Sequence, residues 1–195
     1  GALRADEAVN SDDAGVAVPA LEAVVKRDPK NAAAHARLCD LLRKADPQKS
    51  LAHCRAAAEV EPANASYATG YAAALVQLRR FGEAAAILRR VVAAEPDNYA
   101  AHANLATALD ELKQYEEALD EYKWIARARP EIAVTHFLIA RAYDLLGEYK
   151  LALEAYETFL ARADPARNQL EIEKVKLRKP ALLDQIKRGV KPRKR

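Results

Sequence analysis

The 195-residue sequence contains no methionine, only six glycines and only three phenylalanines. Much of its 51% hydrophobic content is alanine and leucine. Few glycines and many alanines favour helix, because glycine costs about 1 kcal/mol relative to alanine inside a helix. No apolar run approaches the roughly 20 residues that a helix needs to cross a bilayer. The composition therefore predicts a helical chain with no transmembrane segment.

The first ten residues, GALRADEAVN, lack the basic and then apolar pattern of a secretory signal. Because methionine is absent, the initiator residue is missing as well, and we expect either a processed chain or an excised fragment. The intact mass compared with the reading frame distinguishes these two cases. A cytoplasmic protein and an exported, periplasmic one are both compatible with this start, so the compartment stays open.

Motifs that carry catalysis are also missing. The sequence contains no phosphate-binding Gly-Lys-Ser/Thr, no Gly-x-Ser-x-Gly, no Cys-x-x-Cys and no His-Glu-x-x-His. The only serines are Ser11, Ser50 and Ser66, and no histidine is placed to activate one of them. The sequence therefore predicts a protein that is not an enzyme and that holds no cofactor and no metal.

What the sequence does contain is a 34-residue repeat, clearest over residues 99–132. Each copy has two segments with apolar residues at helical spacing, a short polar break between them and a proline just after the second. Residues of one kind recur in this register: Leu75, Leu109 and Tyr143; Ala84, Ala118 and Ala152; Leu88, Tyr122 and Tyr156; Pro62, Pro96 and Pro130. Agreement at so many positions indicates tandem helical hairpins.

This repeat resembles the tetratricopeptide repeat family over roughly residues 32–164. The pairs Ala72/Ala84, Ala106/Ala118 and Ala140/Ala152 match the small residues where the two helices of a family hairpin touch. The family's frequent tryptophan early in the first helix is His35, Ala68, His102 and His136 here. The resemblance implies an all-α fold, a right-handed α-solenoid of tandem hairpins.

The repeat register divides the chain into seven segments. They are a degenerate N-terminal repeat (1–31), four repeats (32–64, 65–98, 99–132 and 133–166), a C-terminal capping helix (167–189) and a basic tail (190–195). A final helix with a polar outer face is what the end of such an array requires. In it we expect Leu170, Val175, Leu182, Leu183 and Ile186 to be buried, and Pro180 to end or kink the helix.

Histidine and cysteine allow more than one interpretation. His35, His102 and His136 occupy one position in three hairpins about 10 Å apart, too far for a shared metal, so we expect structural roles.

Cys39 and Cys54 face each other across a hairpin. We expect two buried free thiols. A disulfide in an exported protein and a small zinc or copper site with His35 are the alternatives.

Positive charge gathers at the C-terminal end. Residues 174–195 hold ten Lys or Arg against one acid, Asp184, a net charge of +9. The total is +3, which leaves −6 for the first 173 residues. A basic tail can bind nucleic acid or an anionic membrane surface, although no interleaved aromatic residues are present for base stacking.

In the family, the first helices of the hairpins line a concave groove that receives a peptide or a partner helix. By that resemblance the groove candidates are Arg37, Asp40, Lys44, Thr69, Gln77, Asn104, Thr107, Glu111, Phe137, Arg141 and Asp144. The Lys/Asn clamp by which some members hold a chaperone's C-terminal carboxylate is absent. We expect Phe137 to anchor a partner peptide and Arg141 to pair with its carboxylate. Packing of Phe137 against the capping helix is the alternative.

These observations predict a non-enzymatic protein–protein interaction scaffold with a protein or peptide partner. Two alternatives stay open. One is association with nucleic acid or an anionic membrane through the basic tail. The other is a binding module of a larger multidomain protein.

Overall fold

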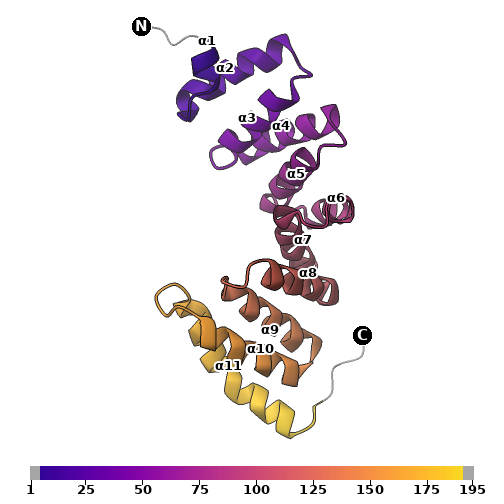
Figure 1. Ribbon diagram of the computed structural model, residues 1–195, viewed down its shortest axis with the longest axis vertical. Helices are drawn as coiled ribbons and strands as arrows, with labels where there is room; N and C mark the ends of the chain where they lie inside the picture. The colour runs from indigo at the N-terminus through magenta and orange to yellow at the C-terminus, as the bar shows by residue number, and fades with distance from the viewer. Residues whose placement is uncertain (1–4, 191–195) are drawn as a thin grey trace. The chain divides into compact units, whose positions relative to one another are not determined.

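The computed structural model describes residues 5–190, and over that range it contains eleven α-helices and no strand (Figure 1). The all-α prediction is confirmed. In chain order the helices are α1 (Ala5–Val9), α2 (Ala14–Arg27), α3 (Ala32–Leu42), α4 (Pro47–Val60), α5 (Ala65–Gln77), α6 (Phe81–Ala94), α7 (Tyr99–Glu111), α8 (Tyr115–Ala128), α9 (Val134–Leu146), α10 (Tyr149–Arg162) and α11 (Gln169–Lys187).

A recurrent asparagine starts the first helix of three hairpins. The side-chain oxygens of Asn31, Asn64 and Asn98 accept hydrogen bonds from backbone N–H groups in the first turns of α3, α5 and α7. These bonds satisfy donors that have no partner inside the helix. Ile132 stands at this position before α9, whose start has no side-chain cap. Polar caps thus set the hairpin boundaries along most of the array.

Small residues lie where the two helices of a hairpin meet. Ala72 and Ala84 are fully buried in the α5–α6 hairpin, and Ala140 and Ala152 are fully buried in the α9–α10 hairpin. The helix pairs that pack on each other are mostly successive in the chain, from α1 with α2 to α10 with α11. This is the tandem hairpin arrangement that the repeat predicts.

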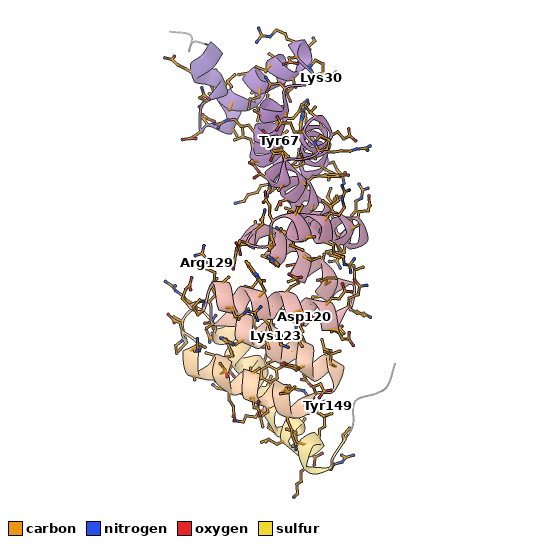
Figure 2. The ribbon with its side chains drawn as sticks, turned by 45° about the vertical axis from the view of Figure 1, so that its right-hand side comes forward. Lys30, Tyr67, Asp120, Lys123, Arg129 and Tyr149 are labelled. Atoms are coloured by element: carbon orange, nitrogen blue, oxygen red, sulfur yellow. A yellow bond between two sulfur atoms is a disulfide. The ribbon has the colours of Figure 1, made fainter. Side chains whose placement is uncertain are left out.

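The chain forms two compact units, residues 1–104 and residues 105–195, with the division inside α7. In the first unit, Ala17 and Leu21 of α2 pack with Leu38 of α3 in a buried cluster. In the second unit, aromatic residues of α9 and α10 pack with apolar residues of α11. Figure 2 labels Lys30 and Tyr67 in the first unit, and Asp120, Lys123, Arg129 and Tyr149 in the second.

The C-terminal segment is one continuous helix, α11, with Pro180 inside it. Val175 and Leu182 are buried as predicted, since they lie seven residues apart on one face. The expectation for Leu170 and Leu183 is wrong: they are 62% and 45% exposed, because they lie away from that face. Gly189, in the left-handed region with φ of 63°, ends the helix. Residues 191–195 of the basic tail lie outside the described residues.

Candidate functional site

Phe137, the expected anchor for a partner, lies inside the second unit. Its side chain is only 8% exposed, and its ring centroid lies 5.9 Å from that of Tyr156 and 5.6 Å from that of Phe159. The Lys174 ammonium of α11 lies 6.0 Å from the same ring centroid. The anchor interpretation is therefore wrong and its alternative holds. A large aromatic side chain at this position joins α9 to α10 and to the capping helix.

Arg141 does not offer its charge to a ligand, because Asp110 already neutralises it. The guanidinium of Arg141 on α9 donates a hydrogen bond to the Asp110 carboxylate at the end of α7. Tyr122 of α8 lies against the same pair. Burial, with the Asp110 carboxylate adding to it, raises the pKa of the Tyr122 phenol to about 12. The expected pairing of Arg141 with a partner carboxylate is replaced by a pair within the chain.

The next hairpin repeats this arrangement 34 residues further on. Asp144 and Tyr156 stand in register with Asp110 and Tyr122, and Arg178 of α11 supplies the cation. Burial raises the pKa of Tyr156 to about 12 as well, and Asp144 is the second cause. The charged groups of this face that the sequence offered as ligands for a partner therefore fasten neighbouring helices to each other.

Apolar side chains remain accessible on the same side of α9. Val134, Leu138 and Leu145 are separated by four and seven residues, which places them on one face with Arg141 between them. Val134 and Leu138 are half-buried, and Leu145 is 47% exposed. We call these three residues the α9 apolar face. Apart from Phe137, the candidate set contains only polar residues and so does not include these three, although apolar residue types at groove positions are visible in the sequence.

The candidates in the first unit are largely engaged with the chain itself. Arg37 donates to the Ser11 carbonyl at 2.9 Å, Asp40 accepts from Arg43 at 2.6 Å, and Gln77 donates to the Arg43 carbonyl at 2.8 Å. Thr69 is buried and Lys44 is exposed.

The last three candidates lie on α7. Asn104, at the end of the first unit, donates to the carbonyl of Ala100 in the preceding turn, at 2.8 Å. Thr107 and Glu111, which belong to the second unit, are exposed. Among the described candidates on α7, Asn104 is thus bonded within its own helix, whereas Thr107 and Glu111 lie on the surface.

Two of the register histidines have the same structural role. His35 Nε2 lies 3.2 Å from the Pro29 carbonyl oxygen, and His102 Nε2 lies 2.9 Å from that of Pro96. A carbonyl only accepts, so each ring donates to the proline that precedes its hairpin. At the third position Arg162 donates to the Pro130 carbonyl at 3.3 Å instead. These contacts hold the chain that enters α3, α7 and α9.

Cys39 and Cys54 form a disulfide between α3 and α4. Both sulfurs are bonded, so the expectation of two free thiols is wrong, and so is the alternative of a zinc or copper site with His35. Ser50 lies beside the disulfide and donates to the Cys39 carbonyl at 2.6 Å. Among the described residues, no group of three His, Cys, Asp or Glu side chains could hold a metal ion. Nor is any helix in residues 5–190 long and apolar enough to cross a membrane.

Sequence models of one family cover most of the chain. Models of the tetratricopeptide repeat match residues 3–59, 36–99, 75–135 and 133–164. No curated protein sequence matches significantly.

Solved structures of the protein MamA have the same fold. MamA of AMB-1 is 25% identical with a TM-score of 0.71 and is matched over 80% of this chain and 92% of its own. MamA of MSR-1 is 25% identical with a TM-score of 0.71, over 80% and 90%. A further MamA crystal structure is 18% identical with a TM-score of 0.73, over 83% and 95%. The likeness shows that the chain has the fold of a helical-repeat α-solenoid.

Proposed function

We propose that this chain, which belongs to the tetratricopeptide repeat family, is a non-enzymatic scaffold that binds a partner peptide or helix on the first-helix side of its hairpins. The family and its fold support a protein-interaction module in general. The finer proposal rests on one observation in the second unit. Leu145 of the α9 apolar face is exposed, whereas Val134 and Leu138 are half-buried and Leu138 also packs against the buried cluster of this unit. The charged residues Arg141 and Asp144 beside them are already paired within the chain.

The exposed Leu145 side chain is the part of the α9 apolar face whose burial by a partner would contribute most to the free energy of binding. Covering apolar surface contributes about 25 cal/mol for each Å² removed from water. The face belongs to an ordered helix whose charged neighbours are held by ion pairs, so the scaffold loses little conformational entropy when a partner binds. A preformed apolar helix face of this kind supports the binding of a segment that presents apolar side chains.

The paired charges indicate which partner suits the face. Arg141 and Arg178 are engaged by Asp110 and Asp144, and a ligand carboxylate would have to displace these partners. An acidic peptide therefore has less to gain than an amphipathic segment with apolar residues at helical spacing. We propose such a segment as the partner.

Two other functions are distinguished by direct measurements. Binding to nucleic acid or anionic vesicles through the basic tail requires residues 190–195 and weakens steeply with salt. A role as the binding module of a larger multidomain protein is tested by whether the full reading frame encodes further domains. Binding through the basic tail does not use the α9 apolar face, so variants of that face separate it from the proposal.

The test is affinity purification from the native host with two matched variants. Leu145→Asp places a charge on the α9 apolar face, whereas Leu151→Asp places one on α10, where Leu151 is 41% exposed. Because both leucines have similar exposure, each variant should melt close to the wild type. Partners that are lost with Leu145→Asp and retained with Leu151→Asp support the proposal. Equal recovery with both variants contradicts it.

A further inference from the structure

The α3–α4 hairpin differs from its neighbours at the positions that join its two helices. Helices α3 and α5 begin 33 residues apart, and α4 and α6 begin 34 apart. In that register Cys39 stands where the other hairpins have Ala72, Ala106 and Ala140, and Cys54 where they have Leu88, Tyr122 and Tyr156. A covalent bond thus occupies the place of a contact between a small and a large side chain.

The large side chains at the second position are buried in the other hairpins. Leu88 is fully buried, and Tyr122 and Tyr156 are each 5% exposed. The Cys54 side chain is much smaller and by itself would contribute less apolar contact to the hairpin. The Cys39 and Cys54 Cα atoms lie 4.9 Å apart. The disulfide therefore supplies the connection that packing supplies elsewhere.

The surroundings of the bond are polar for a hairpin interior. Ser50 stands at the position of Ala84, Ala118 and Ala152, and its hydroxyl lies 3.8 Å from Cys54 Sγ. On the other side, Arg43 Nη2 lies 3.9 Å from Cys39 Sγ. Arg43 is also paired with Asp40, and both sulfurs are buried. Thiol–disulfide exchange with an outside partner therefore requires the hairpin to open.

We infer that the α3–α4 hairpin is a redox-dependent element, closed when Cys39 and Cys54 are bonded and loosened when they are reduced. To close it, the two thiols lose two electrons and two protons to a disulfide oxidant of the dithiol–disulfide class, which is reduced to its dithiol. A dithiol reductant reverses the exchange. The first unit is then fully ordered only where such an oxidant is present, as in an oxidising compartment.

Hydrogen exchange of the full chain, read by mass spectrometry, tests this inference. Wild-type protein is compared oxidised and after reduction in denaturant followed by refolding with reductant, and alkylation confirms two free thiols. Two double variants accompany it. Cys39→Ala/Cys54→Ala removes the bond without replacement, whereas Cys39→Ala/Cys54→Leu restores the pair found at Ala72 and Leu88.

Reduced wild type and the Ala/Ala variant should exchange the α3 and α4 amides roughly 100-fold faster than oxidised protein, the effect of opening a 15-residue loop. The α9 and α10 amides serve as the internal reference and should not change. The Ala/Leu variant should stay protected with or without reductant. Unchanged exchange after reduction overturns the inference, and so does an Ala/Leu variant that exchanges as fast as Ala/Ala.

Discussion

Arg178 donates two hydrogen bonds, each 2.7 Å long, to the carboxylate of Asp144, which lies 34 residues earlier in the chain. The bonds join α11 to α9, and Gln185 accepts a further bond from the same guanidinium. Buried Val175 and Leu182 pack beneath them. The final helix is therefore held to the second unit by a bidentate ion pair as well as by apolar contact.

Replacing Arg178 should loosen this final helix. The Arg178 and Asp144 side chains are only 30% and 14% exposed, so Arg178→Ala leaves a largely buried carboxylate with fewer partners. We expect a loss of about 1–3 kcal/mol in the free energy of unfolding, measured by urea denaturation. Lys176→Ala, which breaks the exposed pair with Glu173, is the control and should change it by less than about 1 kcal/mol. If both variants changed the free energy of unfolding equally, the Arg178–Asp144 pair would contribute no more to stability than the exposed Lys176–Glu173 pair.

The α7–α8 hairpin should be sensitive to side-chain size at the positions where the repeat predicts that its two helices touch. Ala106 and Ala118 are both fully buried in the second unit. Ala118→Leu should therefore overpack the hairpin and lower the free energy of unfolding by about 1–3 kcal/mol. Ala161→Leu, at an exposed position of α10, adds the same atoms without a clash. If both variants unfold at the same urea concentration, the predicted contact position is wrong.

Acid should weaken the first unit through a histidine pair. His35 Nε2 donates to the Pro29 carbonyl, so its Nδ1 accepts from His53 Nδ1–H at 2.9 Å. Burial, then His35 and Lys49, lowers the pKa of His53. The folded chain therefore binds fewer protons than the unfolded chain. Stability is fully present above a pH of about 6.5 and is lost as the pH falls from there towards the lowered pKa.

Thermal melts between pH 8 and pH 5 measure this effect. The melting temperature of wild type should fall more steeply than that of His53→Gln, which keeps a hydrogen-bond donor but does not titrate. His136 also has a lowered pKa, caused by burial and by Arg162, so both proteins retain some pH dependence. If the melting temperatures of wild type and His53→Gln fell equally with pH, protonation of His53 would not be the cause of the loss of stability.

The repeat made the fold predictable because its information is local. The fully buried alanines and the prolines between the hairpins both follow from residue type and spacing. Which face of α11 packs against the second unit was harder to predict. Leucines occur on both of its faces, and sequence alone did not show that Val175 and Leu182, rather than Leu170, face α9 and α10.

Side-chain roles were harder to predict because they depend on partners from other repeats. Arg141 and Asp144 occupy positions that the family resemblance offers for ligands, yet Arg141 pairs with Asp110 of the preceding hairpin and Asp144 pairs with Arg178 of the final helix. Spacing alone does not place α10 and α11 against Phe137, so the sequence does not predict that this side chain is buried. The disulfide depends likewise on the proximity of two helices, which the sequence left as one of three alternatives.

The most direct measurement of the central claim is photo-cross-linking in the native host. A benzoyl-phenylalanine replaces Leu145 on the α9 apolar face in one variant and Leu151 on α10 in the other, and the products are separated by mass. Binding on the α9 apolar face predicts a discrete cross-linked protein partner at residue 145 that is absent or much weaker at residue 151. Cross-linking at residue 151 alone, or the same products at both sites, would contradict binding on the first-helix side.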